Sequence, residues 1–176
     1  MRIIHGKYRS RRLIIPKKLK ARPTTDQARE SLFNILINRV CFEDVKVLDL
    51  FSGTGSISME FASLGTQDIT LIEKNKFQIQ FINKNIELLG IESISVIQGD
   101  VFTFLKRENV KYDIIFADPP FDLQGIGQLP ELITPLLSDT QSVLILEHGP
   151  STTFDGHPGL RETRRYGKVH FSFFGI

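Results

Sequence analysis

Apolar runs of strand length alternate with stretches of helical periodicity along most of this chain. Such alternation is typical of a parallel α/β sheet, because the connection between two parallel strands is usually a helix packed on the sheet. We therefore expect an α/β domain with helices on both faces of its sheet. Strands are expected at residues 47–50, 68–73, 93–98, 112–117 and 142–147, and helices at residues 28–40, 56–64, 75–89, 101–106 and 129–137.

Two further strand-like runs, residues 160–166 and 169–174, lie on either side of Gly167-Lys168 near the end of the chain. Runs separated by so short a connection predict a β-hairpin. We expect this hairpin to form an antiparallel edge of the sheet, with its phenylalanine side chains in the core.

The first 25 residues carry nine Lys or Arg side chains and no acidic one, so the rest of the chain has a net charge of −7. A basic block of this kind attracts a nucleic-acid backbone and releases counterions on binding. Apolar residues interleave with the charges, so we expect an ordered β-hairpin arm over residues 1–23 rather than a disordered tail, followed by a main domain over residues 24–176. The expected phosphate-binding residues are Lys7, Arg9, Arg11, Arg12 and Arg22.

The residues after the basic block predict the start of a helix. Thr24 as the N-cap and Gln27 three residues later have the spacing of a capping box. Arg29 and Asn34 lie in this helix, where each either faces a ligand or is an ordinary solvated residue. Both interpretations stay open from the sequence.

Composition restricts the class of protein. With 176 residues, 41% of them hydrophobic, the chain is long enough to bury the core of one domain. A single cysteine, Cys41, permits no intramolecular disulfide, and the four histidines lack metal-ligand spacing, so we expect neither a secreted disulfide scaffold nor a metal site. No apolar run reaches the roughly 18 residues of a membrane span and no signal peptide is evident, so we expect a cytoplasmic protein without membrane contact.

A glycine loop follows the first predicted strand. Gly53 and Gly55 allow the backbone to adopt positive φ and to approach a ligand closely, and the next helix presents unpaired N–H groups. Ser58 stands at the third glycine position of a dinucleotide fingerprint, which favours a cofactor without phosphates. We expect a nucleotide-like cofactor here, in contact also with Asp49 and Phe51.

Acidic residues end the next two predicted strands. Glu73 lies eighteen residues after Gly55, near the position at which an acidic side chain binds ribose hydroxyls. Asp100, followed by Val101, can accept a hydrogen bond from an adenine amino group. Each acid taken alone is more often a solvated loop residue. Because the strand ends of a parallel sheet share one edge, these residues together predict a single cofactor site.

Asp118-Pro119-Pro120-Phe121 follows the fourth predicted strand and suits the binding of an exocyclic amino group. The Asp118 carboxylate can accept one N–H, the Pro119 carbonyl can accept the other, and Phe121 can stack on the base. The prolines restrict the backbone, so the acceptors need little ordering when substrate binds. The alternative is a strand-terminating Asp-Pro turn. We expect Asp118, Pro119 and Phe121 to be the catalytic residues.

These motifs resemble known enzymes. The glycine loop at residues 49–55, combined with Asp118-Pro119-Pro120-Phe121, resembles S-adenosylmethionine-dependent amino-methyltransferases. More specifically, residues 2–13 and 22–34 resemble the RsmD family of bacterial 16S rRNA guanine-N2 methyltransferases, and the resemblance covers nearly the whole chain. The chain departs from the family's commonest pattern at His5, where glycine is often found, and in its short C-terminal section.

The resemblance implies a Rossmann-like class I methyltransferase fold, with a mostly parallel seven-stranded sheet and a C-terminal antiparallel hairpin. It implies S-adenosylmethionine as cofactor, with S-adenosylhomocysteine as product, and methylation of the N2 amine of a guanine. It further implies 16S rRNA as partner, within an assembled or partly assembled small ribosomal subunit. We expect the chain to act as a monomer.

Three other interpretations remain open. A nicotinamide-dependent oxidoreductase shares the glycine loop but would not require Asp118-Pro119-Pro120-Phe121 or the basic segment. A DNA or RNA adenine-N6 or cytosine-N4 amino-methyltransferase shares the same amino-group chemistry. A non-enzymatic RNA-binding module would explain the basic segment but would leave the acidic strand ends without a role.

Overall fold

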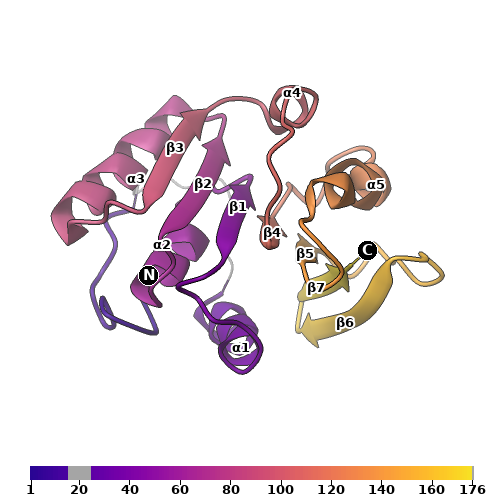
Figure 1. Cartoon of the computed structure of the whole chain (residues 1–176), viewed down its shortest axis with the longest axis horizontal. Helices are drawn as coiled ribbons and strands as arrows, with labels where there is room; N and C mark the ends of the chain where they lie inside the picture. Colours follow the sequence, from indigo (N-terminus) through magenta and orange to yellow (C-terminus); the bar gives the residue numbers. More distant parts are fainter. Residues whose placement is uncertain (16–24, 176) are drawn as a thin grey trace.

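A computed structural model describes residues 1–15 and 25–175, which are built on one mixed seven-stranded sheet (Figure 1). The strand order is β3-β2-β1-β4-β5-β7-β6; the first five strands in this order are parallel, β7 runs antiparallel to β5, and β6 runs antiparallel to β7. The predicted mostly parallel sheet with a C-terminal hairpin is therefore confirmed. The strands are β1 (Lys46–Leu50), β2 (Asp68–Glu73), β3 (Ile94–Gln98), β4 (Ile114–Ala117), β5 (Val143–His148), β6 (Leu160–Tyr166) and β7 (Val169–Phe174).

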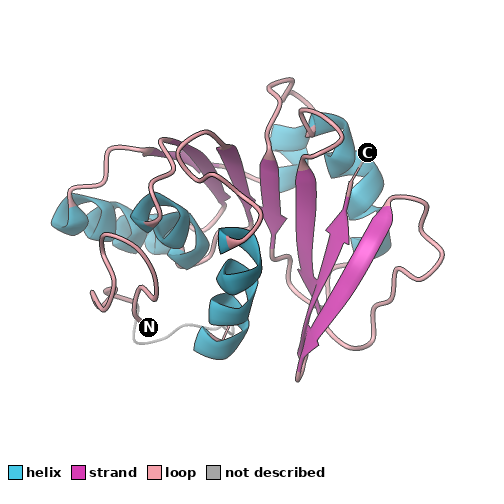
Figure 2. Cartoon of the chain, turned by 60° about the horizontal axis from the view of Figure 1, so that its bottom comes forward, coloured by secondary structure: helices cyan, strands magenta, loops and turns pink. Residues whose placement is uncertain are grey.

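Helices cover both faces of the sheet (Figure 2). One face packs against α1 (Asp26–Ile37), α2 (Ser56–Ser63) and α3 (Lys76–Leu89). The other face packs against α4 (Val101–Leu105) and α5 (Leu129–Ile133), the latter flanked by the short 3₁₀ helices η1 (Ile126–Gln128) and η2 (Thr134–Leu136). None of the described helices has the length and apolar content that a bilayer crossing requires.

The chain begins the sheet at β1, adds β2 and β3 on one side of it and then adds β4 and β5 on the other side. The order of strands therefore switches sides between β1 and β4. In open α/β sheets a ligand site forms beyond the carboxyl ends of the strands at such a switch, because the connecting loops diverge there. The glycine loop after β1 and the Asp118 tetrapeptide after β4 are therefore neighbours in space.

Several helix boundaries differ from those expected, among them the start of α1 and the end of α5. Thr25 caps α1, with its hydroxyl accepting a hydrogen bond from the Ala28 N–H at 3.2 Å; the expected cap, Thr24, lies outside the described residues. The helix expected over residues 129–137 is α5 followed by η2. Pro135 explains the change, because proline has no N–H to continue the α-helical hydrogen bonds.

The expected N-terminal hairpin arm is not seen. The described part, residues 1–15, contains a single antiparallel bridge between Arg2 and Arg12 and no strand. Ile3 and Leu13 are buried with apolar side chains of α2 and α3, so the segment lies on the main domain (Figure 1). Backbone hydrogen bonds join the two ends of the segment, such as the one from the Ile3 N–H to the Arg11 carbonyl at 3.0 Å, and burial of its apolar side chains holds it on the domain. Residues 16–23, including Arg22, lie outside the described residues.

Gly6 allows this segment to approach α2. Its φ is +74°, a conformation that side chains rarely adopt, and a Cβ at this position would collide with the Ser63 carbonyl. The neighbouring Lys7 N–H donates to that carbonyl at 2.7 Å. The turn therefore requires glycine.

A buried ion pair anchors the same segment. Arg29 is fully buried and donates from Nε to Glu60 Oε1 at 3.1 Å and from Nη2 to the Arg2 carbonyl at 2.7 Å. Glu60 also accepts from the Ile4 N–H at 2.8 Å and the His5 N–H at 3.2 Å. Arg29 therefore joins α1, α2 and the N-terminal segment instead of facing a ligand.

Asn34 has a comparable role at the surface of α1. Its Oδ1 lies 3.2 Å from His5 Nε2. This contact ties a second point of the helix to the N-terminal segment.

Candidate active site

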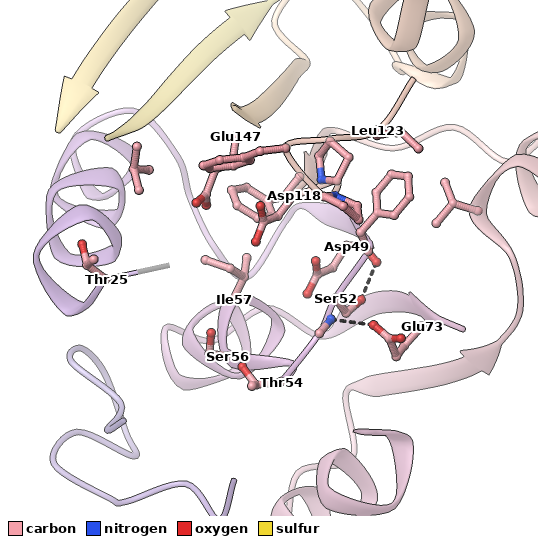
Figure 3. A pocket seen from close by; sticks show the side chains of 18 of the residues that line it. Thr25, Asp49, Ser52, Thr54, Ser56, Ile57, Glu73, Asp118, Leu123 and Glu147 are labelled. Carbon is pink, nitrogen blue, oxygen red and sulfur yellow. Dashed lines mark hydrogen bonds between the residues drawn. The ribbon is translucent and has the colours of Figure 1, made fainter. Parts of the chain in front are cut away.

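A cavity of about 1200 Å³ lies at the carboxyl ends of β1, β2, β4 and β5 (Figure 3). The strand-end residues singled out from the sequence line it, with one exception: Gly55 is not on the wall but caps α2 with a φ of +71°. The predicted residues on the wall are Asp49, Phe51, Gly53, Glu73, Asp100, Val101, Asp118, Pro119 and Phe121.

Glu73 holds the glycine loop in place. The Gly53 N–H donates to Glu73 Oε2 at 2.8 Å, and the Asn75 N–H donates to Oε1 at 2.7 Å. Both carboxylate oxygens are thus engaged by backbone, although each keeps a further lone pair for a ligand hydroxyl. The neighbouring Phe51 adopts a left-handed conformation (φ +59°) that is uncommon for a large side chain and typical of functional sites.

Asp49 is buried beneath the loop. Its Oδ2 accepts a hydrogen bond from Ser58 Oγ at 2.6 Å, and burial raises the pKa of the Asp49 carboxyl to about 7. Ser58, which stands at the third glycine position of the dinucleotide fingerprint, therefore holds the Asp49 carboxylate in place. Asp49 Oδ1 has no hydrogen-bond partner among the described residues, and neither does Gln78 Oε1, which lines the same cavity from α3.

These two acceptors test whether the cavity suits S-adenosylmethionine. Buried acceptors without a protein donor are uncommon and call for one from a ligand. The cofactor carries an ammonium, two ribose hydroxyls and an adenine amine as donors, and it has no phosphate to repel the carboxylates. The hydrogen-bond donors of the cofactor therefore complement the unpaired acceptors of the cavity.

Asp100 follows β3 and Asp118 follows β4, so the two lie on opposite sides of the glycine loop that follows β1. It caps α4 by accepting from the Thr103 N–H at 3.1 Å, and Lys74 Nζ lies 3.2 Å from its other oxygen. These contacts hold the pKa of Asp100 below its usual value, first through the Thr103 N–H and then through Lys74. Val101, the next residue, is buried at the cavity wall.

Asp118 stands at the centre of a row of three carboxylates. The sheet face that packs on α1 and α2 presents Asp49 from β1, Asp118 after β4 and Glu147 from β5, and all three point into the same part of the cavity (Figure 3). Because Ala117 pairs with Leu146, Asp118 and Glu147 follow at the same level of adjacent strands. Burial, and then the charges of Glu147 and Asp49, raises the pKa of Asp118 well above its usual value.

The rest of the tetrapeptide forms one side of the cavity mouth. Pro119 is buried, whereas the Phe121 side chain is 44% exposed and lies against the backbone of Gly149. An exposed ring at the mouth of a cavity is suited to stacking on an incoming base.

Sequence reasoning missed two residues of this site. Glu147 is the next-to-last residue of the buried strand β5, and Glu73 ends β2, so the same pattern of acids at strand ends would have found Glu147. Gln78 lies in the first turn of α3 between Phe77 and Ile79, and nothing in the sequence distinguishes it from Gln80 two residues later. Only the packing of α3 brings it to the cavity.

Comparison with protein families places the whole described domain in one family. The family described as Conserved hypothetical protein 95 matches residues 1–175. Ribosomal RNA small subunit methyltransferase D of Buchnera aphidicola is 32% identical over 182 residues, covering 99% of this chain and 91% of that protein.

Solved structures share the fold. A putative methyltransferase, yhhF, from Escherichia coli superposes with a TM-score of 0.84 at 28% identity, covering 99% of this chain and 97% of that chain. SMU.776, a putative methyltransferase complexed with SAH, superposes with a TM-score of 0.70 at 18% identity, covering 84% of this chain and 49% of that chain. The expected class I methyltransferase fold and cofactor are confirmed. This chain belongs to the Conserved hypothetical protein 95 family and is an RsmD-like S-adenosylmethionine-dependent methyltransferase.

Proposed function

We propose that this enzyme methylates the exocyclic N2 amine of a guanine in 16S rRNA. The observation that carries the proposal is the position of Asp118-Pro119-Pro120-Phe121 beside the cofactor loop, where an amino group would meet the reactive methyl. The similarity to ribosomal RNA small subunit methyltransferase D supports rRNA as the substrate class.

S-adenosylmethionine, when bound, supplies an electrophilic methyl group on a sulfonium. We assign its binding to Asp49, Phe51, Gly53, Glu73 and Gln78, with Asp100 and Val101 at the adenine end and Gly55 shaping the loop. The charge of the sulfonium favours a carboxylate nearby, and Asp49 meets this requirement when it is ionised.

The target amine is a weak nucleophile because its lone pair is delocalised into the ring. Hydrogen bonds from its N–H groups to the Asp118 carboxylate and the Pro119 carbonyl orient the nitrogen and favour its pyramidal form. Positive charge develops on nitrogen as it takes the methyl from the sulfonium, whose S–C bond breaks to leave the neutral thioether of S-adenosylhomocysteine. Asp118 stabilises this charge until the extra N–H proton is lost to solvent. Since a stacked base cannot present its amine in line, the guanine must be unpaired or flipped, with Phe121 stacking on it.

The substrate in this proposal is an assembled or partly assembled small subunit, on which the chain acts as a monomer in the cytoplasm. The N-terminal 23 residues serve RNA binding and residues 24–176 serve catalysis. Lys7, Arg9, Arg11 and Arg12 have exposed side chains that suit phosphate contacts. Arg22 is proposed on sequence grounds alone.

Mapping of methylated nucleotides tests the proposal. Small-subunit rRNA from cells lacking this chain should miss one N2-methylguanine, and the purified enzyme with S-adenosylmethionine should restore it. Restoration by a chain carrying Asp118→Ala should fail. A methylated adenine or cytosine, in DNA or RNA, would instead favour an adenine-N6 or cytosine-N4 enzyme.

Replacement of Arg9, Arg11 and Arg12 by alanine should weaken RNA binding and lower the slope of log affinity against log salt by up to about three, because each phosphate contact contributes about one. Binding of S-adenosylhomocysteine should not change, since these side chains lie outside the cavity lining. Titrations of RNA at several salt concentrations measure both quantities. Equal slopes for this variant and the wild type would contradict phosphate binding by the segment. The matched control is the exposed basic set Lys106, Arg107 and Lys111.

A further inference from the structure

A second, smaller cavity of about 330 Å³ adjoins the main one at the edge of the sheet. It lies between the loop at residues 150–155 and the β6–β7 hairpin. Pro150 and Arg165 line both cavities, so the two are adjacent. The smaller cavity is lined mainly by polar side chains: His148, Thr152, Thr153, Asp155, Thr163, Arg165 and His170.

The floor of the small cavity is a hydrogen-bonded network. The His148 ring lies 2.8 Å from Ser172 Oγ through Nε2 and 3.0 Å from the Gly149 carbonyl through Nδ1. Thr163 Oγ1 lies 2.9 Å from the same serine oxygen. Burial lowers the pKa of His148, so the ring is neutral at pH 7. The network therefore supports the wall without adding charge.

Arg165 supplies the permanent positive charge of this wall. It pairs with His170 across the hairpin, on the face that carries Thr163 and the small cavity. Asp155 lines the same small cavity, and no ion pair joins its carboxylate to the Arg165 guanidinium. An exposed arginine held at a polar cavity is suited to bidentate contact with a phosphate.

The adjacent arginine points to the other face. Arg164 pairs with Phe171, and its guanidinium contacts Glu162 Oε2 at 2.6 Å and 2.8 Å. Arg164 and Arg165 are neighbours in the chain and carry the same charge. Because side chains alternate along a strand, they lie on opposite faces of the sheet, and only Arg165 lines the cavities. The chain therefore provides its own matched control.

We propose that the small cavity binds the sugar and backbone phosphate of the nucleotide next to the target, with Arg165 holding the phosphate; this rests on the proposed function. A base flipped into the main cavity leaves its neighbour at the rim, where the two cavities join. A volume of a few hundred cubic ångströms matches a ligand of nucleoside size. The RNA then contacts the enzyme on both sides of the main cavity, since β6 and the N-terminal segment lie at opposite ends of the sheet (Figure 1).

The test compares Arg165→Ala with Arg164→Ala, using small-subunit RNA and single-stranded oligonucleotides that contain the target guanine. Arg165→Ala should raise the KM for RNA about tenfold, the loss of one charge-assisted contact of about 1.4 kcal/mol, while kcat changes less than KM. It should also lower the salt slope of binding by about one. Arg164→Ala should bind RNA as the wild type does, and S-adenosylhomocysteine should bind all three proteins equally.

A substrate with one uncharged methylphosphonate linkage beside the target guanine identifies the contact. The wild type should lose about tenfold in affinity for this RNA, whereas Arg165→Ala should lose nothing further, because the same contact cannot be removed twice. Additive losses, or equal losses in both arginine variants, would overturn the subsite. A wild-type enzyme that methylates no RNA would refute the proposed function and the substrate named here. Equal binding of the oligonucleotides by wild type and Arg165→Ala, with methylation intact, would refute the subsite alone.

Discussion

Asp118→Ala should lower the single-turnover rate of methyl transfer by at least about a hundredfold, with cofactor binding nearly unchanged. A hydrogen bond that strengthens as positive charge develops on the amine acts on the barrier, and each 1.36 kcal/mol there is worth about tenfold in rate. The Asp118 side chain points into the cavity and not into the apolar core, so its loss should leave the fold intact. Rapid-quench measurement on a ribosomal substrate with saturating cofactor gives the rate.

Two related variants separate charge from geometry at this position. Asp118→Asn should fall between wild type and alanine, because the amide retains an acceptor but not the negative charge. Phe121→Ala should chiefly weaken capture of the base, by about 1–3 kcal/mol of stacking. An Asp118→Ala enzyme that turns over at the wild-type rate would reduce the tetrapeptide to a structural turn.

Protonation of the Asp118 carboxylate should lower the rate of methyl transfer on the acidic side of the pH–rate profile. Burial, with the charges of Glu147 and Asp49, raises the pKa of Asp118, so lowering the pH protonates it before an ordinary carboxyl would be protonated. A protonated carboxyl cannot stabilise the developing ammonium as an anion does. The single-turnover rate should therefore fall with decreasing pH above the usual carboxyl range, and the Asp118→Asn rate should lack this fall. Because Asp49 has a pKa of about 7, cofactor binding is to be kept saturated at each pH.

Glu60→Ala should lower the free energy of unfolding by about 3–5 kcal/mol, the usual cost of leaving a buried charge without its partner. Arg29 is fully buried and has its Nε on Glu60, and the N–H groups of Ile4 and His5 also donate to this carboxylate. All three donors lose an acceptor in the variant. Chemical denaturation of the full chain measures the change.

Asp26→Ala is the matched control, because Asp26 contacts the same guanidinium at 2.9 Å but is 54% exposed. Solvent screens an exposed pair, so this variant should lose less than about 1 kcal/mol. If the two variants had equal free energies of unfolding, the buried Arg29–Glu60 pair would contribute no more to stability than the exposed Arg29–Asp26 pair. Slower refolding of Glu60→Ala alone would also indicate that the buried pair stabilises the fold.

The sequence predicted correctly those features that depend on neighbouring residues. The hairpin was located from two alternating runs around Gly167-Lys168, and β6 and β7 have the expected bounds. The acids at strand ends were found because parallel strands finish at a common edge, whatever packs around them. The expected N-terminal hairpin arm is not seen, because burial of Ile3 and Leu13 against α2 and α3 holds this segment on the domain instead of as a separate ribbon.

By itself, then, the sequence determined the order of strands and helices, the glycine loop and the residues proposed to face the amine, since each is encoded within a few positions of the chain. Only the tertiary structure decided that Glu147 stands beside Asp118, that Gln78 reaches the cofactor cavity, and that Arg165 rather than Arg164 faces the small cavity. These relations join residues far apart in the chain. They depend on strand register and on which side of the sheet each side chain occupies, and both are set by packing across the whole domain.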